Sequence, residues 1–81
     1  MLSMTKDSKL KPQDAIKMAV NFFGAKGLGL ILKEEDNCSV YFEGAGGGVR
    51  VTAAGAKKGS KIDIETTEWE SQVKDFLAKL K

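Results

Sequence analysis

Residues whose types could do chemistry are few in this sequence, and histidine, the commonest general base and metal ligand, does not occur. Asp63 and Glu65 lie two positions apart, so a strand would place both carboxylates on one side, where such a pair can act in acid–base catalysis or hold a divalent cation. Lys61 precedes them and Arg50 is expected beside them, so a ladder of opposite surface charges is the simpler interpretation. An enzyme is therefore the least favoured class, and we predict no catalytic residue, no metal and no cofactor.

A single cysteine, Cys38, excludes an intramolecular disulfide and a four-cysteine metal site. A lone cysteine is typical of a reducing compartment, so we expect a cytoplasmic protein. Cys38 begins a predicted strand on its inward side, and no base that could activate its thiol is close in the sequence. We predict a small buried hydrophobic residue at this position, not a nucleophile.

The glycine-rich stretch GAGGG at 44–48 offers consecutive N–H groups that could cradle an anion. A dinucleotide-binding fingerprint would need a glycine at the sixth place and then a helix, whereas Val49 holds that place and a strand follows. We therefore predict a hairpin tip whose glycines serve backbone geometry, either mobile or packed closely on a partner. Gly44, Gly46 and Gly47 are candidate contact residues at this tip.

A second candidate loop tip holds Lys57 and Lys58, which could contact phosphates but are more typical of a solvated turn. The net charge of +2 comes from the first eleven residues, because the ten basic and ten acidic residues of 12–81 cancel. Proteins that bind a nucleic acid duplex neutralise several phosphates, so a neutral body disfavours that partner. No apolar run approaches the length that crosses a bilayer, and we predict no membrane partner.

The elements that must position these residues follow from hydrophobic periodicity. Apolar and polar side chains alternate strictly through 38–52, which is typical of two strands with one buried and one exposed face. Further strands are predicted over 28–34, with Leu28, Leu30 and Leu32 pointing inward, and over 61–66. Helical spacing of apolar residues predicts one amphipathic helix that begins at Pro12. A second begins at a capping box formed by Thr67 and Glu70.

These elements predict an α+β fold. Four strands joined by short turns form an antiparallel meander, and the N- and C-terminal helices each need an apolar surface to cover. The simplest arrangement is a two-layer αββββα sandwich with both helices on one face of the sheet. We expect residues 1–10 to be a mobile N-terminal tail and residues 11–81 to form a single domain.

The other face of that sheet is expected to be open to solvent. Four-residue loops at 44–47 and 56–59, with a three-residue turn at 35–37, place side chains in rows across it. One row reads Ile31, Tyr41, Arg50 and Glu65, and the next reads Lys33, Ser39, Thr52 and Asp63.

Two interpretations of this face stay open. Cross-strand pairs of this kind stabilise sheets without any ligand, whereas tyrosine and arginine are also enriched at interface hot spots. The first hypothesis is a small non-catalytic binding domain that self-associates as a homo-oligomer or docks a protein partner through the open face, with candidate contacts Ile31, Tyr41, Arg50, Thr52 and Glu65. The alternative is a single-stranded nucleic-acid-binding module in which Tyr41 stacks a base and Arg50, Lys33 and Lys61 meet phosphates.

Overall fold

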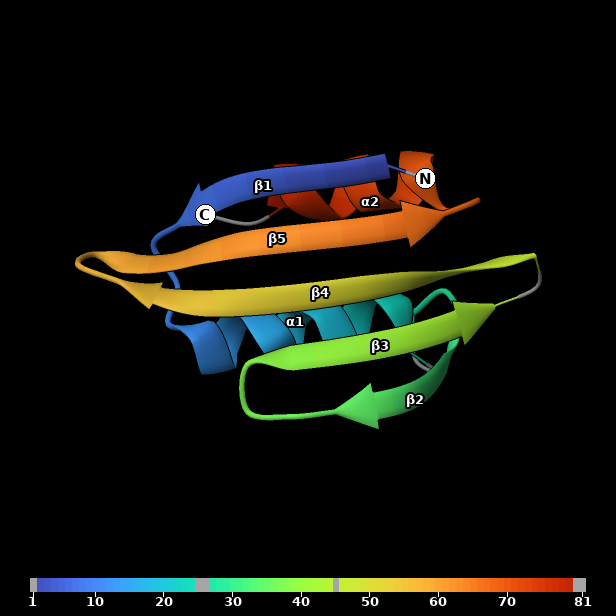
Figure 1. The fold of residues 1–81 in the computed structure, drawn as a ribbon, viewed down its shortest axis with the longest axis horizontal. Helices are drawn as coiled ribbons and strands as arrows, with labels where there is room; N and C mark the ends of the chain where they lie inside the picture. Colours follow the sequence, from blue (N-terminus) through green and yellow to red (C-terminus); the bar gives the residue numbers. More distant parts are fainter. Residues whose placement is uncertain (1, 25–26, 45, 80–81) are drawn as a thin grey trace.

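The computed structural model describes residues 2–24, 27–44 and 46–79. Five strands form one sheet in the order β1-β5-β4-β3-β2, and every neighbouring pair is antiparallel. Both helices lie behind the same face of this sheet (Figure 1). The α+β class is confirmed, and the predicted four-stranded meander is corrected to five strands. The elements are β1 (Leu2–Ser8), α1 (Pro12–Phe23), β2 (Ile31–Glu35), β3 (Ser39–Gly44), β4 (Gly47–Ala56), β5 (Gly59–Thr67) and α2 (Glu70–Lys79).

The fifth strand is the segment predicted to be a mobile tail, so that prediction is wrong for residues 2–8. This strand, β1, pairs with β5 along its whole length and forms one edge of the sheet (Figure 1). Its two-residue period is obscured in the sequence because Lys6 occupies an inward position between Met4 and Ser8. The Lys6 ammonium donates a hydrogen bond to the carbonyl oxygen of Leu77 in the last turn of α2. The positive charge of Lys6 is tolerated on the covered face because it lies at the C-terminal end of α2, where the helix dipole is negative.

The three central strands have the predicted register. Tyr41 pairs with Arg50, and Arg50 pairs with Glu65. Both connecting turns are tighter than the four-residue loops predicted at 44–47 and 56–59, since the end residues of each loop pair with one another. Shortening a loop by one residue on each side leaves the register and the faces unchanged.

Strand β2 differs most from its prediction. Ile31 pairs with Glu43 instead of Tyr41, and Tyr41 pairs with Glu34. A register shift after Leu32 inserts one extra residue into β2, which is a β-bulge. The bulge cannot be read from the sequence, because it depends on how β3 fits against its neighbour.

Of the three leucines near β2 predicted to point inward, Leu30 is buried, with 3% of its surface exposed. Leu32 pairs with the buried Phe42 and therefore points to the covered face as predicted, although it is 37% exposed. Leu28 precedes the strand and is 41% exposed, so that prediction is wrong. Helix α1 packs mainly on β3, β4 and β5, and the covered face of β2 therefore extends beyond the helix layer.

The core lies between the sheet and the two helices and is centred on Phe23 of α1. The Phe23 ring lies 5.8 Å from the Phe42 ring of β3 and 5.2 Å from the Phe76 ring of α2, measured between centroids. One aromatic residue thus joins three elements, because ring pairs at this spacing attract one another beyond simple burial. The buried apolar residues are Ala15, Ile16, Ala19, Phe23, Leu30, Val40, Phe42, Val49, Val51, Ala53, Ile62, Ile64, Val73, Phe76 and Leu77.

The second helix begins later than predicted. Thr67 is the last residue of β5 and pairs with Gly48, so it does not form the predicted capping box with Glu70, where α2 begins. Glu68 turns the chain between the two elements with φ = 73°, in the left-handed region. Neither helix in the described part of the chain has the length and apolar character needed to cross a membrane.

Candidate functional site

The open face, the side of the sheet away from both helices, holds the candidate residues in a corrected order. Across its centre the row reads Glu34, Tyr41, Arg50 and Glu65. Ile31, predicted for this row, lies in the adjacent row with Glu43, Gly48 and Thr67. Three of the predicted residues, Tyr41, Arg50 and Glu65, are therefore brought together, and Glu34 is a member that sequence reasoning missed.

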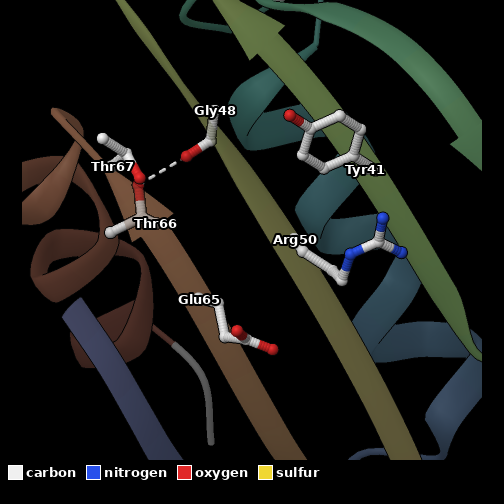
Figure 2. A pocket seen from close by; sticks show the side chains of 6 residues that line it. All are labelled: Tyr41, Gly48, Arg50, Glu65, Thr66 and Thr67. Carbon is white, nitrogen blue, oxygen red and sulfur yellow. Dashed lines mark hydrogen bonds between the residues drawn. The ribbon is translucent and has the colours of Figure 1, made fainter. Parts of the chain in front are cut away.

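Arg50 makes its contacts on the β3 side of its strand. Its Cζ atom lies 4.8 Å from the centroid of the Tyr41 ring, within the range of a cation–π interaction. Its Nη2 atom lies 3.8 Å from Oε1 of Glu34. Figure 2 shows the guanidinium directed toward Tyr41 and away from Glu65. The carboxylate expected to pair with Arg50 was Glu65, and the structure assigns that role to Glu34 because the bulge in β2 brings it into the row.

A shallow depression of about 150 Å³ lies beside the central row. It is located at Gly48, which has no side chain and belongs to the adjacent row. Tyr41 and Arg50 form one side of it, and Glu65 and Thr67 form the other (Figure 2). The hydroxyl of Tyr41 points toward Gly48 (Figure 2). Small-molecule sites usually measure about 300–1,000 Å³, so this depression fits one side-chain group of a partner and not a nucleotide or cofactor.

The floor of the depression is held by a hydrogen bond between adjacent strands. The Thr66 hydroxyl donates to the carbonyl oxygen of Gly48 at 2.8 Å (Figure 2). Thr66 is itself buried, so this bond satisfies its only side-chain polar atom. The backbone under Gly48 is therefore fixed, and the depression is a property of the folded sheet.

The open face is negatively charged. Along the described strands it carries five acidic and three basic side chains, a net charge of −2. Two of the basic residues are paired within the face, since Arg50 contacts Glu34 and Lys33 Nζ lies 4.0 Å from Glu43 Oε2. Glu65 makes no ion pair with any described residue. The acidic members are Glu34, Glu43, Asp7, Asp63 and Glu65, and the basic ones are Lys33, Arg50 and Lys61.

The remaining candidate on this face, Thr52, lies one row away. It pairs with Ser39 and Asp63, as predicted, and it does not line the depression. Asp63 accepts a hydrogen bond from the Thr5 hydroxyl at 2.7 Å. The carboxylate pair considered for catalysis is thus divided, because Asp63 is bound to β1 while Glu65 faces the depression.

Two glycines of the tip, Gly44 and Gly47, are closely packed. A Cβ atom on Gly44 would lie 2.7 Å from Cζ2 of Trp69, and one on Gly47 would overlap the carbonyl oxygen of Thr67. Gly46 has φ = 83°, a left-handed conformation that glycine adopts without steric cost. Because these glycines lack a side chain, the tip packs closely against the connection from β5 to α2. The surface that it contacts belongs to this chain.

Lys57 and Lys58 connect Ala56 to Gly59 and so form the turn between β4 and β5. This turn and the glycine tip lie at opposite ends of β4. Both lysines are exposed, and they line a separate depression of about 410 Å³ beside Asp7. The two candidate loop tips are therefore at opposite ends of the sheet and do not form one site.

Cys38 is exposed in the turn between β2 and β3, so the prediction of a buried hydrophobic residue is wrong. The strand β3 begins one residue later, at Ser39, which removes Cys38 from the alternation that would have buried it. Within the described residues, no three acidic or cysteine side chains are grouped so that they could hold a metal ion.

Comparisons with protein-family models, with curated proteins and with solved structures find no significant match to this chain. The function proposed below therefore depends on the geometry and charge of the open face.

Proposed function

We propose that this chain is a small non-catalytic binding domain that docks a protein partner through the open face, at the depression beside Gly48. The proposal depends on one observation: Tyr41, Glu65 and Thr67 line a depression at Gly48, which has no side chain. The preferred occupant is a lysine side chain of the partner. The depression is too small for a larger ligand and its one unpaired charge is negative.

The three converging side chains share an ability to accept hydrogen bonds. The Tyr41 hydroxyl, the Glu65 carboxylate and the Thr67 hydroxyl all present acceptor oxygens at the rim of the depression. An ammonium group has three donors and no acceptor, which matches such a set. A bond from an ammonium to a carboxylate is also charge-assisted and about twice as strong as a neutral one.

The charge of the open face favours this partner over the other two considered. A face-to-face homodimer would bring together two surfaces that each carry −2, and like charges across an interface oppose association. Single-stranded nucleic acid needs free cations along its backbone. Arg50 and Lys33 are engaged with Glu34 and Glu43, which leaves Lys61 as the uncompensated cation among the three basic residues of the face.

The proposal is tested by following backbone amide shifts of the ¹⁵N-labelled protein while acetyl-Gly-Lys-Gly-amide is added. The matched probe replaces lysine by norleucine, which keeps the chain length and removes the charge. We expect saturable shifts centred on Gly48, Glu65 and Thr67 with the lysine peptide, and no such shifts with norleucine.

Two variants of the same strand identify the residue responsible. Glu65→Gln should weaken binding by about tenfold, the scale of one charge-assisted hydrogen bond. Asp63→Asn is the matched control, because Asp63 lies two residues away on the same face but outside the depression. Equal binding of both probes, shifts centred elsewhere, or insensitivity to Glu65→Gln would each contradict the proposal. A concentration-dependent dimer in sedimentation, abolished by Tyr41→Ala, would support self-association instead.

A further inference from the structure

The edge of the sheet formed by β2 is a second surface with a distinct composition. Among the described residues β2 pairs only with β3, so the hydrogen-bonding groups of its outer edge have no strand beside them. Ile31 is 61% exposed on the open side, and Leu32, on the other side of the same strand, is partly exposed. Exposed apolar residues on an unpaired strand are typical of a surface that adds a strand from another chain.

A groove continues this edge on the helix side of the sheet. It has a volume of about 260 Å³ and lies between one flank of α1 and the end of β2. Ile16 and Val20 provide its apolar wall, Lys17 and Asn21 its rim, and Glu35 the contribution of β2. A strand added beside β2 would direct alternate side chains toward this groove, because successive side chains point to opposite faces.

The charge of the edge indicates what such a strand must carry. Residues 31–36 include one basic and three acidic side chains. The β-bulge turns Lys33 and Glu34 onto the open face, where they contact Glu43 and Arg50. Glu35 and Asp36 make no ion pair with any described residue, so the edge is left acidic.

We propose that the β2 edge binds an extended peptide of a partner protein in which apolar residues alternate with lysine or arginine. Main-chain hydrogen bonds to β2 would hold the peptide, and its apolar side chains would enter the groove against Ile16 and Val20. Its basic side chains would then point to the open face, which carries a net charge of −2, and the unpaired charges of Glu35 and Asp36 would add to their attraction to this edge. A second copy of this chain is a poorer occupant, because pairing two β2 edges brings two acidic segments together. The same charges protect the free edge from pairing with a second copy.

The test uses a blocked peptide of alternating valine and lysine, acetyl-VKVKVKV-amide, added to the ¹⁵N-labelled protein. We expect saturable amide shifts in 31–35 and in α1 at Ile16 and Val20. Two matched peptides separate the contributions: one has glutamate in place of lysine, and one is N-methylated at alternate amides and cannot pair as a strand. Neither should produce these shifts.

Glu35→Lys should weaken binding of the valine–lysine peptide by about two- to fivefold, since it reverses one exposed charge at the edge. Asp75→Lys is the matched control: it makes the same change of net charge at an exposed position of α2 and should leave binding unaltered. Leu32→Gln, which removes the apolar contact, should also weaken binding. Because Glu65→Gln leaves the β2 edge intact, a failure here is distinguishable from a failure of the lysine site on the open face.

Three outcomes would overturn the proposal. The N-methylated peptide could bind as well as its parent, which would reduce the interaction to charge attraction. The shifts could lie outside β2 and α1. The edge could already be filled by a second copy, seen as a dimer in sedimentation without peptide and as concentration-dependent shifts of 31–35.

Discussion

Tyr41 leans diagonally across the β3–β4 pair so that its hydroxyl lies over Gly48. A Cβ atom on Gly48 would lie 2.8 Å from the Tyr41 hydroxyl oxygen and 2.9 Å from the carbonyl oxygen of Phe42. The aromatic ring therefore covers a glycine inside a strand, an arrangement that offsets the weakness of glycine in sheets. The same absence of a side chain creates the depression proposed to take a lysine.

Replacing Gly48 with alanine should destabilise the fold by about 1–2 kcal/mol, because a backbone oxygen must yield together with the tyrosine ring. The free energy of unfolding is measured by urea titration. Gly55→Ala is the matched control in the same strand, since its new Cβ would meet only Pro12 at 4.0 Å. That variant should be neutral or stabilise by about 0.4–1 kcal/mol. Equal changes in the free energy of unfolding for the two variants would show that the packing of Tyr41 over Gly48 contributes nothing to stability.

Lys6→Met should lower stability by about 1–2 kcal/mol, because it leaves the carbonyl oxygen of Leu77 without its donor at the end of α2. Hydrogen exchange of the last α2 turn should accelerate more than exchange in β4. Lys74→Met, at an exposed position of the same helix, should change stability by less than about 0.5 kcal/mol. An unaltered exchange rate in α2 after Lys6→Met would show that the ammonium contributes nothing to holding the helix.

Glu68→Gly should stabilise the chain by about 0.5–1 kcal/mol. The left-handed conformation at φ = 73° is unfavourable for a residue with a Cβ atom, and glycine adopts it without steric cost. Glu68→Ala keeps the Cβ atom and should not be stabilising, so the difference between the two variants isolates the backbone contribution. A glycine variant less stable than the alanine variant, by thermal unfolding, would contradict this account.

Cys38→Ser should change the free energy of unfolding by less than about 0.5 kcal/mol, since Cys38 is exposed. The thiol of the native protein should react with a disulfide reagent at a rate close to that measured in urea. A thiol that reacts only after unfolding would place Cys38 in the interior.

The sequence by itself determined the faces and register of the three central strands. Because side chains alternate with a period of two, the buried valines of β3 and β4 leave Tyr41 and Arg50 on the opposite side. Turn positions marked by glycine and lysine then restrict the register to one choice that keeps Arg50 beside Glu65. This much depends on neighbours in sequence, and it brought together three of the residues that line the depression.

Only the tertiary structure decided the two edges of the sheet. β1 forms because the free edge of β5 needs hydrogen-bonding partners and because the end of α2 lies where it can receive the charge of Lys6, two conditions set by residues far away in the chain. At the other edge, the bulge brings Glu34 to Arg50, and the limited reach of α1 leaves Leu32 uncovered. Contacts between segments distant in the sequence leave no periodic pattern of apolar residues. The two edges of the sheet, and the binding surface proposed at β2, can therefore be identified only from the tertiary structure.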